Sequence, residues 1–135
     1  MGSTLRRNKR PPLYRDLERI LAMVCEMTDR AYKRSKSLTL MNGDLIHDIR
    51  EAISYAAIAL NTEDENLKAQ CITTIKIKMW VVSTTLERIY FSQANTRHHF
   101  LSEGQYGNII DCMNAIDVAQ ERWQAKYTST KDSHN

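Results

Sequence analysis

The sequence contains few of the residues that interrupt helices. Among 135 residues there are only two prolines and four glycines. They are Pro11, Pro12, Gly2, Gly43, Gly104 and Gly107. The long stretches between them hold few clustered β-branched or aromatic residues. This shortage argues against a turn-rich β fold, so the sequence predicts an all-α protein.

The sequence also lacks a long apolar run and a signal peptide. No stretch approaches the roughly 20 apolar residues that cross a bilayer, and the basic residues 6–10 lead into two prolines. The three cysteines, Cys25, Cys71 and Cys112, are odd in number and far apart. Buried free thiols in a reducing compartment explain them better than disulfides do. We therefore expect a cytoplasmic protein with no membrane partner.

Apolar residues recur at spacings of three and four in four segments, which predicts four amphipathic helices. The first helix begins at Pro12 and ends in the basic run at residues 33–36. A connection at residues 37–43 then leads to the second helix. That helix starts at Asp44 as its N-cap, or as early as Leu38.

The last two helices have recognisable starts. Thr62 with Glu65, and Ser102 with Gln105, each fit a capping box. A very short turn at residues 61–62 requires the second and third helices to form a hairpin. The sequence thus predicts an up-down-up-down antiparallel four-helix bundle. It divides the chain into a flexible basic arm (1–11), the bundle (12–128) and a disordered tail (129–135).

The third helix has more apolar surface than one core-facing stripe needs. Ile72, Ile77, Trp80 and Val81 lie off its main seam. A helix that is apolar on two faces is either central in a large core or covered by another chain, and a bundle of this size has no central position. We therefore expect a subunit interface at Ile77, Trp80 and Val81. The alternative is a wide core face with one partly exposed tryptophan.

Positive charge is concentrated at the N-terminal end. Residues 1–36 hold ten basic and four acidic side chains, whereas residues 37–135 hold nine basic and twelve acidic ones. Such a concentration attracts polyanions and releases their counterions. The alternative is an ordinary solvated helix face. The candidate nucleic-acid-binding residues are Arg6, Arg7, Lys9, Arg10, Arg15, Arg19, Arg30, Lys33, Arg34, Lys36, Lys76, Lys78 and Arg88.

No catalytic signature accompanies this charge. The sequence has no phosphate-binding loop, dinucleotide glycine pattern or zinc-protease motif. We therefore expect no enzyme activity, no cofactor and no metal site. One alternative is a small helical ribonuclease acting through Arg97, His98 and His99, although their spacing does not reproduce that of known helical ribonucleases.

Four segments carry a resemblance to a known family. They are residues 13–17 (LYRDL), 38–43 (LTLMNG), 59–61 (ALN) and 101–106 (LSEGQY). Together they resemble the accessory variability determinant family of diversity-generating retroelements. That family is related to the four-helix proteins encoded in intervening sequences of bacterial 23S ribosomal RNA genes, which remain an alternative assignment. The likeness covers about residues 13–127.

This resemblance implies a specific role. Members of the family are four-helix bundles that assemble into a pentameric barrel with a positive surface. They bind the retroelement's reverse transcriptase and its template RNA or DNA, and they support mutagenic retrohoming. The family's basic positions on its third helix, near an aromatic residue, correspond to Lys78 beside Trp80 and to Lys76. The basic arm at residues 6–10 matches no family motif, so its role depends on charge alone.

Overall fold

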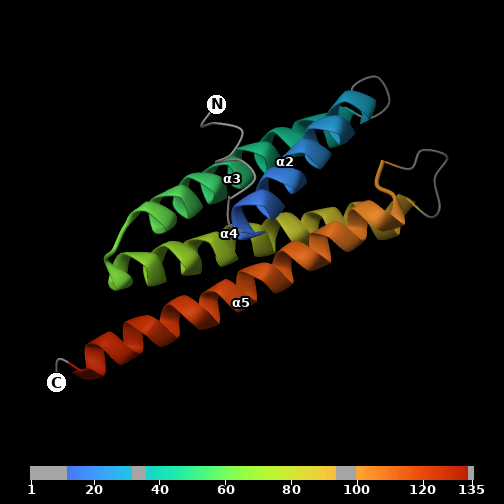
Figure 1. Cartoon of the computed structure of the whole chain (residues 1–135). Coiled ribbons are helices and arrows are strands. Elements are labelled where there is room, and N and C mark those ends of the chain that lie inside the picture. Colours follow the sequence, from blue (N-terminus) through green and yellow to red (C-terminus); the bar gives the residue numbers. More distant parts are fainter. Residues whose placement is uncertain (1–11, 32–35, 94–99, 134–135) are drawn as a thin grey trace, which may run out of the picture.

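The computed structural model describes residues 12–31, 36–93 and 100–133, and in this part the chain forms four helices and no strand. The helices are α2 (Pro12–Ala31), α3 (Lys36–Asn61), α4 (Glu65–Ser92) and α5 (Glu103–Ser133). Helices α3 and α5 each contact both α2 and α4, so the four helices surround one core (Figure 1). The all-α prediction is confirmed. None of the helices described is long and apolar enough to cross a membrane.

The core consists of the inward apolar faces of all four helices. Its fully buried side chains include Leu17, Val24, Ile49, Ile75, Leu86 and Ile116. Burial of one such side chain contributes about 1.5–3 kcal/mol relative to leaving it exposed. Ile72, which the sequence placed off the seam of the third helix, is fully buried as well. The core-facing side of α4 is therefore wider than the periodic pattern suggested.

The start of α5 is the capping box that the sequence predicts. The Gln105 N–H donates to Ser102 Oγ at 3.1 Å, and the Ser102 N–H donates to Gln105 Oε1 at 2.8 Å. Each side chain satisfies a backbone donor that the first helical turn leaves without a partner. Helix α2 likewise begins at Pro12, as predicted.

The start of α4 corrects a prediction. Its N-cap is Asp64 rather than Thr62, and Asp64 Oδ1 accepts from the N–H groups of Asn66 and Leu67 at 3.0 and 3.2 Å. Thr62 Oγ1 instead accepts from the Asp64 N–H at 3.1 Å. Asp64 is one of the strongest N-cap residues and lies directly before the helix, so it caps in place of Thr62.

Two predicted boundaries were also wrong. Helix α3 begins at Lys36, so the expected connection at residues 37–43 is helical and Asp44 is not its cap, whereas the alternative start at Leu38 is only two residues from the observed one. Gly43 has no positive φ, and the helix passes through it without a turn. At the other end, α5 reaches Ser133 through most of the expected disordered tail. No glycine or proline follows Gly107, so no helix breaker interrupts α5 before Ser133.

One buried polar side chain closes the α4–α5 connection. Gln93 Oε1 accepts from the N–H groups of Phe100 and Leu101 at 3.0 and 3.1 Å, and Gln93 Nε2 donates to the Leu101 carbonyl. Both functions of the amide are therefore used inside the protein, as a buried polar group requires. The side chain joins the end of α4 to the residues that precede α5.

Candidate interaction surface on α4

The outer face of α4 is the most apolar exposed helix face in the described part of the chain. Eight large apolar side chains are exposed among the residues that the structure describes, and four of the eight belong to α4. Trp80 is 62% exposed, Ile77 61%, Phe91 59% and Val81 46%. Their spacing places them, with Thr84 and Arg88, along one side of the helix. We call this set of six residues the outer stripe of α4.

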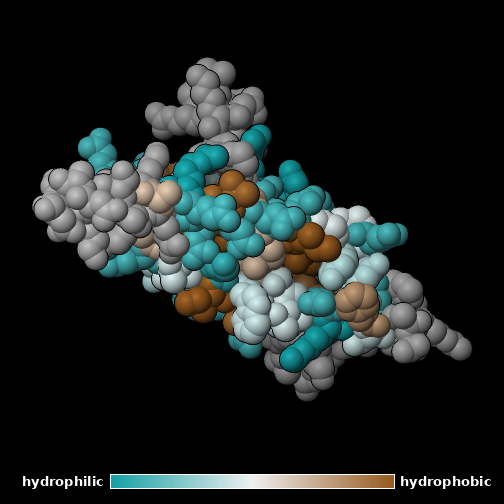
Figure 2. Space-filling model, turned by 90° about the horizontal axis from the view of Figure 1, so that it is seen from below, coloured by the Kyte–Doolittle hydropathy of each residue, from teal (hydrophilic) through white to brown (hydrophobic). Residues whose placement is uncertain are grey.

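The remaining exposed apolar residues are distributed over α3 and α5: Ile58 and Leu60 on the first, Ile110 and Val118 on the second. The view from below in Figure 2 shows hydrophobic atoms in separate places, with hydrophilic side chains between them. Scattered apolar residues are normal on a protein surface, whereas adjacent ones such as Ile77, Trp80 and Val81 indicate a contact site.

Phe91, at one end of the outer stripe, is held by two neighbouring rings. Tyr90 and Tyr106 stack in parallel with centroids 4.4 Å apart, and this pair joins α4 to α5. The Phe91 ring meets both tyrosines edge-on, at 5.3 and 5.6 Å. These contacts fix the orientation of a ring that remains largely exposed. Phe91 also lines a shallow depression with Thr84, Glu87, Arg88 and Ser92.

The two lysines that the resemblance implicates lie on either side of the outer stripe. Lys76 Nζ reaches α5, where it lies 3.1 Å from Asp117 Oδ1 and donates to Gln120 Oε1 at 2.8 Å. Lys78 Nζ reaches α3 and lies 2.5 Å from Glu51 Oε2. Both ammonium groups are therefore paired with carboxylates, and neither contributes a free positive charge.

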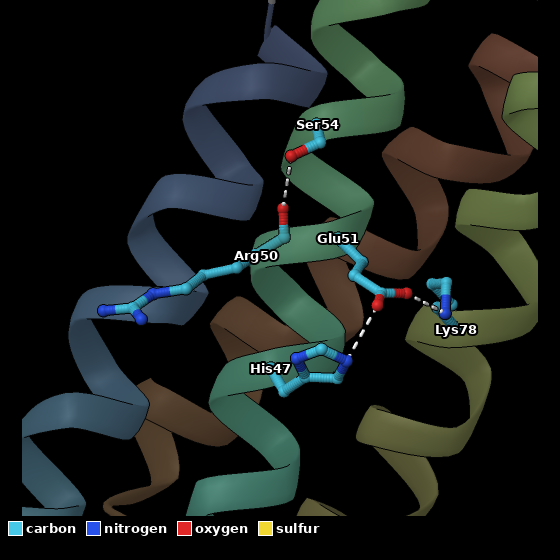
Figure 3. A network of polar contacts seen from close by, with 5 residues as sticks. All are labelled: His47, Arg50, Glu51, Ser54 and Lys78. Atoms are coloured by element: carbon cyan, nitrogen blue, oxygen red, sulfur yellow. Dashed lines mark hydrogen bonds and ion pairs between the residues drawn. The ribbon is translucent and has the colours of Figure 1, made fainter.

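Glu51 also contacts a second basic residue. His47 Nε2 lies 2.7 Å from Glu51 Oε1, so the carboxylate lies between an imidazole and an ammonium group (Figure 3). The hydrogen bond from Lys78 lowers the pKa of Glu51 below its ordinary value, and the same bond raises the pKa of Lys78. Arg50 points away from this group, toward α2 (Figure 3).

The basic residues of α2 are only partly described. Arg15 and Arg19 are exposed, and Arg19 Nη1 lies 3.7 Å from Asp16 Oδ1. Burial raises the pKa of Asp16, against the opposing effect of Arg19 and Arg15 and with a contribution from Asp111. Glu26 and Asp29 are also exposed on this helix, and its four acidic residues outnumber its three arginines, so the positive charge of the N-terminal end lies outside α2.

The structure leaves other predicted basic residues without a described side chain. Arg30 and Lys36 belong to helices, but their side chains are not placed. Outside the described residues lie Arg6, Arg7, Lys9, Arg10, Lys33 and Arg34. The predicted binding set leaves out two exposed arginines, Arg50 on α3 and Arg122 on α5. The signal that could have found them is their position outside the apolar stripes of those helices.

The described part of the chain holds no candidate metal-binding cluster. Residues 12–31, 36–93 and 100–133 hold no group of three or more His, Cys, Asp or Glu side chains that could hold a metal ion. The three cysteines are free, and burial raises the pKa of Cys112 to about 12, so its thiol stays protonated. Arg97, His98 and His99, on which the ribonuclease alternative depends, lie outside the described residues.

Taken together, these features define a helical bundle with an apolar stripe on one outer helix face and ion-paired lysines beside it. No family model matches the chain, and neither a curated protein nor a solved structure does.

Proposed function

We propose that this chain is a non-enzymatic accessory protein of a diversity-generating retroelement. In this role it assembles with copies of itself, binds the reverse transcriptase and binds template RNA or DNA, and thereby supports mutagenic retrohoming in the cytoplasm. The observation that carries the proposal is the outer stripe of α4, which stays exposed although the bundle core is complete without it. The sequence resemblance supplies the identity of the partners.

Assembly is the first part of this role. The subunit is an up-down-up-down antiparallel bundle, and five subunits form a ring, as the resemblance implies. The subunit interface includes Ile77, Trp80 and Val81, because these three large apolar side chains are exposed next to one another on one face of α4. Lys76 and Lys78 are already neutralised beside this stripe, which makes its burial against protein less unfavourable.

Nucleic-acid binding is the second part. The basic arm at residues 6–10 and the exposed Arg15 and Arg19 contact phosphates, and Arg88 adds a charge on the outer stripe. Phosphate contacts position a protein on a nucleic acid but do not read its sequence, so binding is weakly sequence-specific. The other predicted basic residues outside the Lys76 and Lys78 ion pairs add to the same electrostatic attraction.

The test combines the two partners. The protein is purified together with the polymerase encoded beside it, and its affinity for labelled template RNA is measured over a range of salt concentrations. We expect co-purification, and an affinity that falls steeply on a log–log plot, with a slope of about 0.7 for each phosphate neutralised on a single strand. A flat salt response would contradict the nucleic-acid role. A gene inside a 23S ribosomal RNA gene, with no polymerase beside it, would favour the related intervening-sequence proteins instead.

A further inference from the structure

Two acidic side chains, Glu51 and Asp117, form ion pairs with the lysines that flank the outer stripe of α4. We propose that Glu51 and Asp117 act as internal competitors of nucleic acid, holding Lys78 and Lys76 away from phosphates until the carboxylates are displaced. This inference rests on the proposed nucleic-acid binding, and it assigns to Glu51 and Asp117 a role in setting the affinity. Neither residue belongs to the predicted binding set.

The geometry at Lys78 leaves little room for a phosphate. Its ammonium group lies 2.5 Å from Glu51 Oε2, and its side chain is only 24% exposed. The other carboxylate oxygen of Glu51 is held by His47 at 2.7 Å. The negative charge of Asp48 also acts on Lys78. A phosphate that binds Lys78 must therefore replace Glu51 and approach the negative charge of Asp48.

The geometry at Lys76 is more open. Its ammonium group has two partners on α5, Asp117 and Gln120, but its side chain is 42% exposed and that of Asp117 is 52% exposed. Exposed ion pairs contribute little stability, so this pair exchanges partners more readily than the Lys78 pair. A phosphate should therefore displace the carboxylate partner of Lys76 more easily than that of Lys78.

The competition has a measurable size. A lysine freed from its carboxylate can neutralise one more phosphate, which steepens the salt slope by about 0.7 for a single strand. The same slope corresponds to roughly fourfold tighter binding at about 0.15 M salt and roughly eightfold at about 0.05 M. Removal of a carboxylate charge that frees no lysine can change the affinity, but it adds no phosphate contact and so leaves the salt slope unchanged.

The experiment measures the binding of fluorescently labelled oligouridylate by anisotropy at several salt concentrations. The variants are Glu51→Gln, Asp117→Asn and, as a matched control, Glu26→Gln. Glu26 is an exposed glutamate on α2 with no ion pair among the residues that the structure describes. We expect about fourfold tighter binding at about 0.15 M salt and a steeper slope for Glu51→Gln. The gain for Asp117→Asn should be smaller, and Glu26→Gln should leave the slope unchanged.

A double variant separates a freed lysine from a general change of charge. In the Lys78→Gln background, Glu51→Gln should give no steeper slope, because no ammonium group remains to be freed. Equal effects of Glu51→Gln and Glu26→Gln would overturn the inference while leaving nucleic-acid binding in place. Failure of the wild type and of every variant to bind oligouridylate would instead contradict the proposed nucleic-acid role. Circular dichroism confirms that each variant remains helical.

Discussion

The two sides of α4 both carry large apolar residues, yet these residues differ in their exposure to solvent. On the inner side, Ile75, Val82 and Leu86 are completely buried. On the outer side, Ile77 and Trp80 are each more than 60% exposed. Ile77 follows Ile75 by two positions, and this step turns the side chain from the core to the surface. The same residue type therefore has two different roles on one helix.

This difference separates the residues of α4 that form the core from those that remain available to contact another molecule. The inner side supplies a core that the other three helices complete. The outer stripe adds nothing to that core, so the fold does not require it to be apolar. An apolar stripe that the fold does not require is a feature of a protein contact. The largest effects on stability should therefore come from the inner side.

The first prediction uses the matched isoleucines. Ile75→Ala should lower the free energy of unfolding by about 2–5 kcal/mol, because it removes transfer energy and leaves a cavity. Ile77→Ala should change it by less than about 0.5 kcal/mol. Both are measured by urea denaturation in a Trp80→Glu background, in which subunit contacts do not add to stability. Equal losses of unfolding free energy would show that both sides of α4 contribute alike to the stability of the bundle.

The second prediction concerns the polar end of the inner side. Gln93→Ala should lower the free energy of unfolding by about 1–3 kcal/mol, because the N–H groups of Phe100 and Leu101 lose their acceptor. Gln70→Ala is the control, since Gln70 is an exposed glutamine on α4, the helix that Gln93 caps. Thermal unfolding of both variants at one concentration makes the comparison. A loss for Gln70→Ala as large as that for Gln93→Ala would refute the closing role of Gln93.

The smallest expected effect on stability is at Asp16, whose side chain is partly buried. Burial raises its pKa, so the folded protein binds this proton more tightly than the unfolded chain does. Its contribution to stability is therefore fully present below the unfolded pKa and is lost as pH rises through the folded pKa. Asp16→Asn should give a slightly higher melting temperature at neutral pH, and this advantage should shrink as the pH is lowered. A constant difference across pH would contradict the assignment.

Local signals in the sequence predicted several features of the fold correctly. The start of α2 at Pro12, the Ser102–Gln105 capping box and the inner seam of α4 all depend on residues close together in the chain. The start of α4 was missed by two residues, because Thr62 and Asp64 both fit an N-cap and only the backbone conformation chooses between them.

The candidate site was predictable only in part. Helical spacing predicted that Ile77, Trp80 and Val81 lie off the core, and their exposure agrees with that position. The partners of Lys76 and Lys78 could not be predicted, because Asp117 and Glu51 come from other helices and the register between helices is a property of the packed bundle. The same reason explains why the closing role of Gln93 was missed.

The central claim is that the outer stripe of α4 joins subunits, and the molar mass in solution tests it most directly. Light scattering on the purified protein should give an oligomer, with a pentamer as the expected species, and Trp80→Glu should give single chains. Val118→Glu, the same kind of change at an exposed apolar residue of α5, should leave the oligomer intact. A wild-type protein that is a single chain, or an oligomer that survives Trp80→Glu, would contradict the account.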